Sequence, residues 1–599
     1  MRRGRRQGVR LAAALGIAAL AAAPALASTD INFSAPGAGK DLTDRLRAAS
    51  LVMTAPKKGD TPAQDLFAAA RADYVRLVGA LYGAGYYSPV VHIYVNGREA
   101  ADIAPLDAPA TIRSIRIAVT PGPVFRFGSA RIAPLAPKTV LPDGFRPGAI
   151  AASGVIRDAV DTSITGWRQA GHAKATVQSQ KIVADHRTNR LDAGIALDPG
   201  PPVTFGKLTI SGKSAVRRDR IQAIAGFPTG KPYSPKQMQT VANRLRRTGA
   251  FASVALTEAK ALGPGDTLDV DAAVVDQKKH RIGFGGEISN SSGATVSAFW
   301  LNRNLLGGAE QLRIDGEMDG IGAQTGGVGY KLSFRLDRPA TFQPDTAGYL
   351  TGTVQRERLT DYSANKLSLG AGLKRIVGDR LVLQYGLGFD AERVTDSSGT
   401  TAYRDVNLPL EATWDSRDKP LDAHKGLYLD LGVKPFKGWQ GTGSGVRLTF
   451  DTRTYRAVGK SVVLAARLQG GSVAGSSLAA TPRDYLFYSG GGGTVRGQPY
   501  QSLGVNALPS GVRTGGRSFA AISGEIRGMV TQSIGLVAFY DAGYVAAGGL
   551  GSKGEWQAGT GLGLRYDTGI GPLRLDLAVP AGGHTGKGLQ IYLGIGQAF

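Results

Sequence analysis

The second half of the chain, residues 278–599, alternates apolar side chains with polar or small ones at a period of two residues. In the clearest run, one face carries Leu381, Leu383, Tyr385, Leu387 and Phe389. Successive side chains of a β-strand point to opposite faces, so this run is a strand with one apolar and one polar face. The alternation recurs in segments that start at Leu427, Val446, Leu573 and Ile591. This pattern predicts a transmembrane antiparallel β-barrel, with lipid outside and water inside.

The length of this region fixes the expected size of the barrel. Residues 278–599 allow about 20 residues for each of 16 strands with its turn, which suits membrane strands of about 9–11 residues. We therefore predict 16 strands. A soluble β-sandwich or propeller also alternates, and it remains the alternative fold.

The first half of the chain contains an internal repeat. A Pro-Gly-Pro triplet at 121–123 and a Phe-Gly pair at 127–128 recur 78 residues later, at 199–201 and 205–206. In the last copy, the spacing of apolar residues predicts a strand, two helices and two strands. The chain is therefore expected to carry three β-α-α-β-β units, in residues 28–121, 122–199 and 200–277.

The N-terminus has the pattern of an export signal. A basic cluster precedes an apolar run over residues 11–23, and the small residues around Leu26 match a signal-peptidase site. We predict a signal peptide over residues 1–27, with cleavage between Ala27 and Ser28. A short membrane anchor is the alternative.

Composition excludes several kinds of site. The chain has no Cys, and its six His are scattered without the spacing of metal ligands. It contains no zinc-protease, nucleophile-elbow or P-loop motif. We therefore expect no enzymatic activity, no cofactor and no metal. The net charge is +24, but no basic run interleaved with aromatics follows the leader, so we expect attraction to anionic lipid or acidic partners and no nucleic acid.

One connection between predicted strands is unusually long, from about residue 469 to residue 518. It contains four glycines at 490–493, followed by Val495, Arg496, Gly497 and Tyr500. Connections of this length are usually functional or disordered. If the loop folds into the barrel, Arg496 can pair with Glu525 and Asp541 from the next strands. The alternative is an exposed loop with a solvated arginine.

Closure of the barrel must pair the first strand, around 281–288, with the last, around 589–599. Glycine offers no side chain for packing and permits a kink, so Gly594 and Gly596 are expected to weaken the last strand. A tight bend without any opening is the alternative role of these glycines. The predicted lateral seam consists of Ile282, Phe284, Ile288, Ile591, Leu593, Gly594, Ile595, Gly596 and Phe599.

Several motifs in this order resemble the Omp85 superfamily of outer-membrane assembly and secretion proteins, in particular its TamA branch. They lie at 415–422, 495–497, 539–543, 561–576 and 594–599. The three repeated units resemble POTRA domains, so the resemblance covers essentially the whole mature chain. One departure is that an aromatic residue usually follows Val-Arg-Gly directly, whereas Gln498 and Pro499 precede Tyr500 here.

The resemblance implies an outer-membrane barrel of a Gram-negative cell with POTRA domains in the periplasm, and Arg496 paired with Glu525 and Asp541 inside the barrel. It also implies an insertase that helps other outer-membrane proteins, autotransporters among them, to fold through the lateral seam. The implied partners are unfolded outer-membrane proteins, outer-membrane lipid and a TamB-like protein anchored in the inner membrane. The alternatives are a two-partner-secretion pore, a general BamA-like assembly factor, or a passive channel or receptor.

Overall fold

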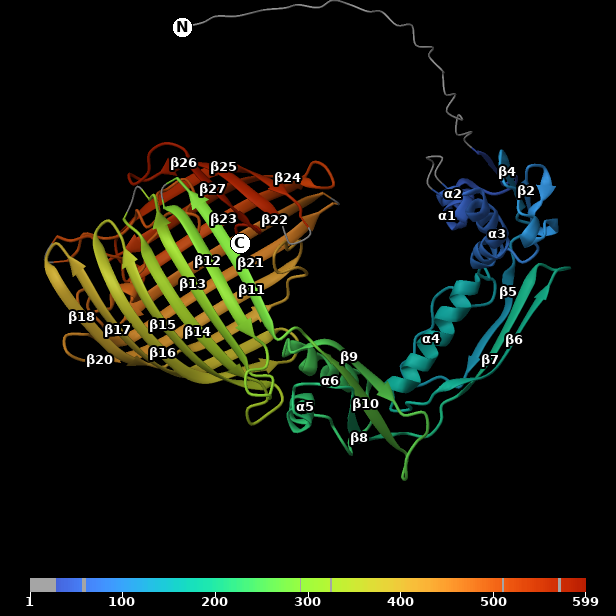
Figure 1. Cartoon of the computed structure of the whole chain (residues 1–599), viewed down its shortest axis with the longest axis horizontal. Helices are drawn as coiled ribbons and strands as arrows, with labels where there is room; N and C mark the ends of the chain where they lie inside the picture. Colours follow the sequence, from blue (N-terminus) through green and yellow to red (C-terminus); the bar gives the residue numbers. More distant parts are fainter. Residues whose placement is uncertain are drawn as a thin grey trace, which may run out of the picture. The chain divides into compact units, whose positions relative to one another are not determined.

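The computed structural model describes residues 29–55, 61–290, 292–323, 326–459, 461–508, 511–568 and 572–599. The chain forms two compact units, residues up to 203 with 232–235, and residues 204–231 with 236–599. The first unit contains two α+β modules, and the second contains a third module and the barrel (Figure 1). No helix within the described residues is long and apolar enough to cross a bilayer. The predicted signal peptide and its cleavage site at Ala27 and Ser28 lie outside the described residues.

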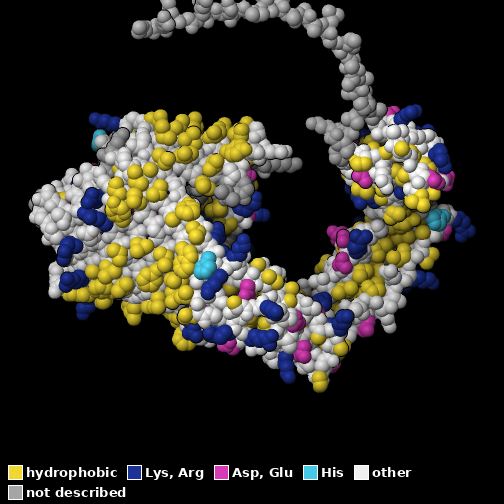
Figure 2. All heavy atoms as spheres, viewed as in Figure 1, with side chains coloured by type: hydrophobic (Ala, Val, Ile, Leu, Met, Phe, Trp, Pro, Cys, Tyr) yellow, Lys and Arg dark blue, Asp and Glu magenta, His cyan; other side chains and the backbone are white. Residues whose placement is uncertain are grey.

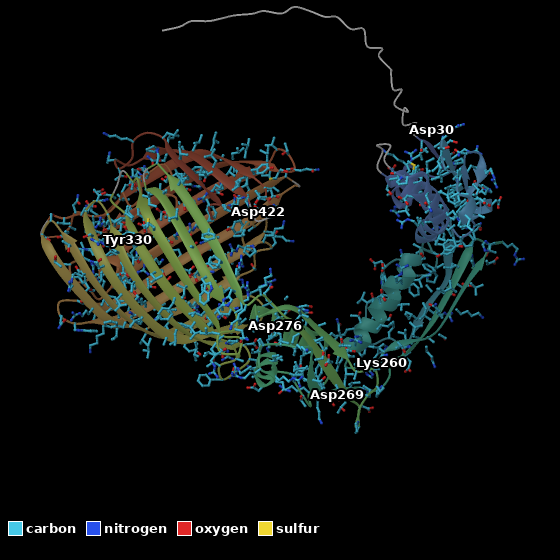
Figure 3. All side chains as sticks on the ribbon, in the orientation of Figure 1. Asp30, Lys260, Asp269, Asp276, Tyr330 and Asp422 are labelled. Atoms are coloured by element: carbon cyan, nitrogen blue, oxygen red, sulfur yellow. The ribbon has the colours of Figure 1, made fainter. Side chains whose placement is uncertain are left out.

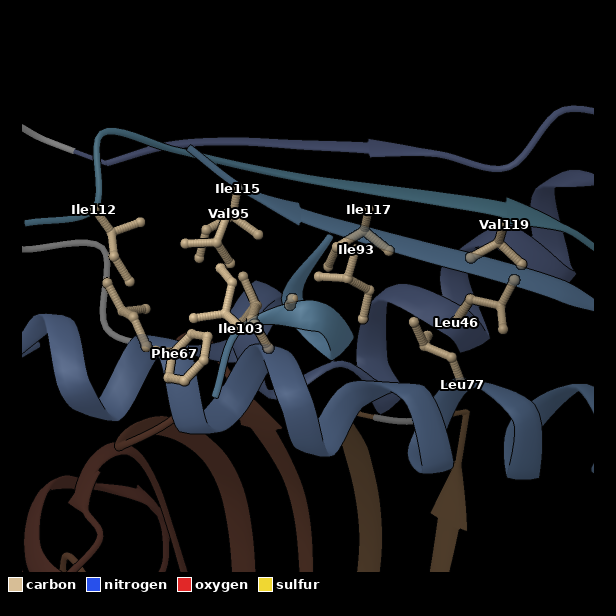
Figure 4. Packing of buried hydrophobic residues seen from close by; sticks show 14 of the residues in the cluster. Leu46, Phe67, Leu77, Ile93, Val95, Ile103, Ile112, Ile115, Ile117 and Val119 are labelled. Atoms are coloured by element: carbon tan, nitrogen blue, oxygen red, sulfur yellow. The ribbon is translucent and has the colours of Figure 1, made fainter. Parts of the chain in front are cut away.

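The first module is a four-stranded sheet packed against helices. Its strand order is β1-β4-β2-β3, and β1 runs parallel to β4. Phe67 and Leu77 of the long helix point toward the sheet, whose Val95, Ile117 and Val119 belong to the same buried cluster (Figure 4). Burial of each such side chain stabilises the module by about 1.5–3 kcal/mol. The elements are β1 (Asp30–Ser34), α1 (Lys40–Ala49), α2 (Leu51–Thr54), α3 (Ala63–Gly83), β2 (Val90–Val95), β3 (Arg98–Glu99), the short 3-10 helices Ala100–Asp102 and Pro105–Asp107, and β4 (Ser114–Thr120).

The second and third modules share one sheet topology. Their strand orders are β5-β7-β6 and β8-β10-β9, and in both the first strand runs parallel to the central one. The third module has the predicted β-α-α-β-β order, whereas the second has one helix among its described residues. Four prolines within residues 134–152 disfavour the other helix, because proline lacks the N–H donor. The elements are β5 (Arg126–Ala133), α4 (Ser153–Gln169), β6 (Thr176–Asp185), β7 (Arg190–Asp198), β8 (Thr204–Ser211), α5 (Arg218–Ala225), α6 (Pro235–Arg247), β9 (Phe251–Glu258) and β10 (Thr267–Asp276).

Residues 280–595 form a closed antiparallel barrel. Its elements are β11 (His280–Ser289), β12 (Gly293–Asn302), β13 (Gln311–Ile321), β14 (Gly329–Arg338), β15 (Thr346–Arg358), β16 (Tyr362–Val377), β17 (Leu381–Asp396), β18 (Gly399–Asn407), β19 (Leu410–Asp415), β20 (Gly426–Gly438), β21 (Ser444–Val458), β22 (Val462–Ala474), β23 (Ser518–Met529), β24 (Ile534–Ala546), β25 (Gly554–Tyr566), β26 (Leu573–Gly582) and β27 (Gln590–Ile595). Both β18 and β19 pair with β17 and with β20, so they are two parts of one strand. The break falls at Pro409, which has no N–H for the ladder. The barrel therefore has the predicted 16 strand positions.

The side chains of the barrel alternate as the sequence indicates. Outward-facing Leu387 is 67% exposed, while Glu392 and Asp405 on inward positions of β17 and β18 are buried. Hydrophobic side chains accordingly spread over the visible face of the barrel (Figure 2). We call the barrel end where β11 follows the third module the near end, and the opposite end the far end.

The third module is fastened to the near end of the barrel by ion pairs. Asp345, in the turn between β14 and β15, accepts hydrogen bonds from Arg244 Nη2 at 2.6 Å and Arg247 Nη2 at 2.5 Å. Burial by itself would raise the pKa of Asp345, but the hydrogen bonds and charges of Arg244 and Arg247 outweigh it and hold the pKa below its ordinary value of 3.8. The pair therefore stabilises this junction at neutral pH.

Candidate functional site

The long loop between β22 and β23, residues 475–517, leaves the far end of the barrel and folds into its interior. Glycines with positive φ at Gly490, Gly491 and Gly497 allow the turns that bring the chain inward. Val495 and Gln498 are fully buried, and Arg496 is 2% exposed. Side chains from the middle of the loop therefore fill part of the barrel interior.

Arg496 is surrounded by three carboxylates. Its Nε and Nη2 donate to the two oxygens of Asp541 at 2.8 and 3.0 Å, which is the bidentate geometry that suits a carboxylate. Its Nη1 donates to Glu525 Oε1 at 2.6 Å and to Asp576 Oδ2 at 3.3 Å. The guanidinium also stacks on Phe539, with Cζ 3.6 Å from the ring centroid. Arg496 thus donates four side-chain hydrogen bonds to three carboxylates inside the barrel.

The period of two residues explains how three strands supply these acids. Glu525 of β23, Asp541 of β24 and Asp576 of β26 all occupy inward positions of their strands. The sequence alone left the orientation of residues 536–544 open, because both faces of that segment are apolar. The structure turns Phe539 and Asp541 inward, while Tyr540 is 51% exposed on the outer face.

Sequence reasoning missed several members of this cluster. Asp576 contacts Arg496 and also accepts from Arg565 Nη1 at 2.5 Å, and Glu525 accepts from Arg527 Nε at 2.7 Å. Asp541 has no ion-pair partner other than Arg496 among the described residues. The charged residues on the inward positions of β23, β25 and β26 were a visible signal, but their mutual distances depend on the barrel's closure.

Gln498 and Pro499, which separate Gly497 from Tyr500, change which side chains reach the barrel interior. Gln498 takes an interior position, where its Nε2 donates to the carbonyl oxygens of Ala558 at 2.7 Å and Gly582 at 3.0 Å. Tyr500 is 43% exposed and makes no hydrogen bond with Arg496. The structure thus brings Val495, Arg496 and Gly497 to the cluster and leaves Tyr500 outside it.

The seam between β11 and β27 is short. Among the described residues, Ile288↔Leu593 and Ser289↔Tyr592 are the two pairs across it, whereas ten residue pairs join β11 to β12. The side chain of Asn290 adds two contacts, from Nδ2 to Leu589 O at 2.8 Å and from Ile591 N to Oδ1 at 3.3 Å. Along residues 280–287, β11 has no ladder partner on its β27 side among the described residues.

The predicted seam residues divide into four groups. Ile288 and Leu593 face each other, and Ile591, Gly594 and Ile595 lie on the paired part of β26 and β27. Ile282 and Phe284 lie on the unpaired edge of β11 and are 64% and 85% exposed. The strand expected to run to Phe599 ends instead at Ile595, so Gly596 and Phe599 are not part of the ladder. Gly596 has φ +93, and the chain there turns inward until Phe599 packs against Tyr455 and Arg527.

The described residues contain no group of three or more His, Asp or Glu side chains placed to hold a metal ion.

Comparison with known proteins adds family matches to this geometry. Residues 304–599 match the Omp85 superfamily domain, and residues 203–276 match the POTRA family, the surface antigen variable number repeat. Among solved structures, BamA from Haemophilus ducreyi lacking POTRA domains 1–3 is similar, with a TM-score of 0.61 and 14% identity over 79% of this chain and 100% of that chain. CdiB from Acinetobacter baumannii is similar with a TM-score of 0.50 and 11% identity over 80% of this chain and 90% of that chain. At these identities the likeness concerns the fold.

Proposed function

Because the chain belongs to the Omp85 superfamily, we propose that it helps other β-barrel proteins to fold and insert into the outer membrane of a Gram-negative cell. The modules of residues 29–276 are its periplasmic arm. Unfolded outer-membrane proteins, autotransporters among them, are its substrates. A TamB-like protein anchored in the inner membrane is its partner at the arm.

The short seam carries this proposal. Unpaired backbone N–H and C=O groups cost several kcal/mol each in hydrocarbon, so a nascent strand needs a partner before it enters the bilayer. The edge of β11 along residues 280–287 offers such a partner, and rupture of two residue pairs extends it over the whole strand. An open strand edge captures another strand by β-augmentation. The substrate's first membrane strand thus pairs with β11 while it crosses the interface.

The interior argues against a passive channel. The loop of residues 475–517 places buried side chains inside the barrel, where Arg496 and Gln498 contact the strands on the seam's β27 side. A permanently open pore needs a clear interior. We therefore expect small and irregular conductance after reconstitution, and a large stable pore with no effect on barrel insertion would contradict the proposal.

A disulfide across the seam tests the proposal directly. The chain has no Cys, so the pair Ile288→Cys and Leu593→Cys, which are directly opposite, can be oxidised without competing thiols. The assay is insertion of an unfolded outer-membrane barrel protein into vesicles that contain the full chain. We expect the oxidised variant to lose the acceleration of insertion and to regain it after reduction.

A matched control is the pair Leu332→Cys and Val354→Cys, which are opposite on β14 and β15. This disulfide locks two strands that stay paired, so insertion should be unchanged. Full activity of the oxidised seam variant, with the disulfide verified by mass spectrometry, would refute the seam mechanism.

The subgroup and the partners need an experiment in the native cell. Depletion of the protein followed by outer-membrane proteomics separates the alternatives. Selective loss of autotransporters supports the TamA-like role. General loss of outer-membrane barrels supports a BamA-like role. Loss of one secreted protein, with all barrels retained, identifies a two-partner-secretion pore. Cross-linking from the first module in the same cells tests for a TamB-like partner.

A further inference from the structure

Three arginines lie on the outward face of the barrel toward its far end. Arg356 of β15 and Arg393 of β17 share one row of the sheet, because both pair with Asn365 of β16. Arg404 of β18 pairs with Ala391 and is one step along the outward face from Arg393. All three side chains are exposed, and their inward-facing neighbours in β17 and β18 are buried.

These three charges have no counter-ion in the part of the chain that the structure describes. None of them forms an ion pair with another residue that the structure describes, and the side chain of Arg404 donates a hydrogen bond to the neutral Gln440. The outward positions of β14 to β18 contain no Asp or Glu. An arginine on the lipid face costs about 2–4 kcal/mol at the bilayer midplane but about 0–1 kcal/mol at the interface. Three of them together on one patch therefore indicate the level of the lipid headgroups.

A hollow of about 1070 Å³ lies on the same outward face. Its floor is apolar and includes Val296, Leu332, Val354 and Leu367, while Arg356, Arg393 and Arg404 line it toward the far end. Tyr330, labelled in Figure 3, is directly opposite Arg356 on the neighbouring strand. In Figure 2, Lys and Arg side chains gather along the left edge of the barrel beside its hydrophobic face. The hollow thus has an apolar floor and three arginines at its far-end side.

We propose that this hollow binds one phosphorylated glycolipid of the outer leaflet, with its acyl chains on the apolar floor and its phosphates on Arg356, Arg393 and Arg404. Neighbouring strands are about 4.8 Å apart, so Arg356 and Arg393 are about 10 Å apart along their row. Diagonal neighbours such as Arg393 and Arg404 are about 7–8 Å apart. This spacing suits a headgroup with two separate phosphates. The inference uses the outer-membrane orientation of the proposed function, but not the insertion activity.

The test measures binding of lipid A to the full chain in detergent by native mass spectrometry. The probe is lipid A with two phosphates, compared with the same lipid after removal of both. Each arginine near an anionic headgroup contributes about a tenfold factor or somewhat less, so Arg356→Gln, Arg393→Gln and Arg404→Gln together should weaken binding about 100-fold. Wild-type protein should bind the dephosphorylated lipid as weakly as the triple variant binds lipid A.

A control with the same chemistry lies at the other end of the barrel. Arg338, Arg375 and Arg456 are also exposed on outward positions, but at the near end of β14, β16 and β21. Their joint replacement by Gln should leave lipid A binding within threefold of wild type. An equal loss in both triple variants, or equal binding of the two lipids, would overturn the site.

Two further measurements keep the test decisive. Folding of each variant is checked by its heat-dependent migration in gels. If the triple variant does not fold, the single variant Arg393→Gln replaces it and should weaken lipid A binding about fivefold. Raising the salt from 0.05 to 0.5 M should weaken wild-type binding, because exposed charges are screened. No substrate barrel is present in these measurements, so a negative result refutes the lipid site and leaves the seam mechanism to its own test.

Discussion

Replacement of Arg496 by methionine removes the cation shared by three buried carboxylates. Glu525 then keeps Arg527 at 2.7 Å, and Asp576 keeps Arg565 at 2.5 Å. Asp541, whose side chain is 1% exposed, has no other cationic partner among the described residues. Breaking a buried pair by removal of one partner costs about 3–5 kcal/mol, because the remaining charge stays buried. We expect Arg496→Met to lower the apparent free energy of unfolding by that amount.

A second substitution isolates the cause. If the cost comes from the unpaired Asp541 carboxylate, then Asp541→Asn in the Arg496→Met background should recover about 2 kcal/mol or more. The remaining loss of about 1–2 kcal/mol corresponds to the lost hydrogen bond to Glu525. The same asparagine in the wild-type background should destabilise, because it weakens the bidentate pair.

The measurement is urea unfolding of the full chain in vesicles, followed by tryptophan fluorescence. Arg375→Met, an exposed outward position on β16, is the matched control and should stay within about 0.5 kcal/mol of wild type. A double variant that is as unstable as the Arg496→Met single variant would refute the charge argument. The loop would then be held by its shape alone.

Three further outcomes follow from close contacts in the structure. A Cβ at Gly559 would overlap the carbonyl oxygen of Arg496, so Gly559→Val should displace the loop and expose it to protease, whereas Gly524→Val, with open space around its Cβ, should not. Gln498→Ala should lower the unfolding free energy by about 1–3 kcal/mol in urea titrations, because the buried carbonyl of Ala558 and the partly buried carbonyl of Gly582 lose their donor. The depressed pKa of Asp345 stabilises the junction above pH 3.8 and loses this effect below it, so hydrogen exchange in α6, corrected for its intrinsic rate, should rise on acidification. Asp345→Asn should show that faster exchange already at pH 7.

The sequence predicted the strands of the barrel and their apolar faces, but it did not predict all the contacts between side chains inside the barrel. A period of two residues says which face of a strand is apolar, so the lipid-facing rows through Leu387 and Leu431 could be derived without any structure. The same pattern does not say which strands become neighbours across the interior. Asp576 lies on β26 and Glu525 on β23, and only the closed barrel brings them to one guanidinium.

Local exceptions to the pattern were not predicted either. The missing helix before α4 could have been expected from its prolines, but the repeat offset suggested otherwise. The end of β27 could not be predicted, because Gly596 tolerates both a strand and the inward turn that it adopts. The turn brings Phe599 into contact with Tyr455 and Arg527, which only the structure shows. Gln498 was noticed as a departure from the family pattern, yet its role follows from the backbone carbonyls that it meets on two strands.

The loop and the seam meet at one residue of the last strand. Tyr592 pairs with Ser289 across the seam, and its hydroxyl oxygen accepts a hydrogen bond from Gly497 N at 3.2 Å. β27 also keeps six residue pairs with β26. When the two pairs of the seam break, β27 therefore remains attached to β26 and to the loop, whereas the ladder with β12 is the only one that β11 keeps among the described residues. The loop stabilises the β27 side of the barrel without adding ladder bonds across the seam, so it holds one wall in place while the edge of β11 becomes free for an incoming strand.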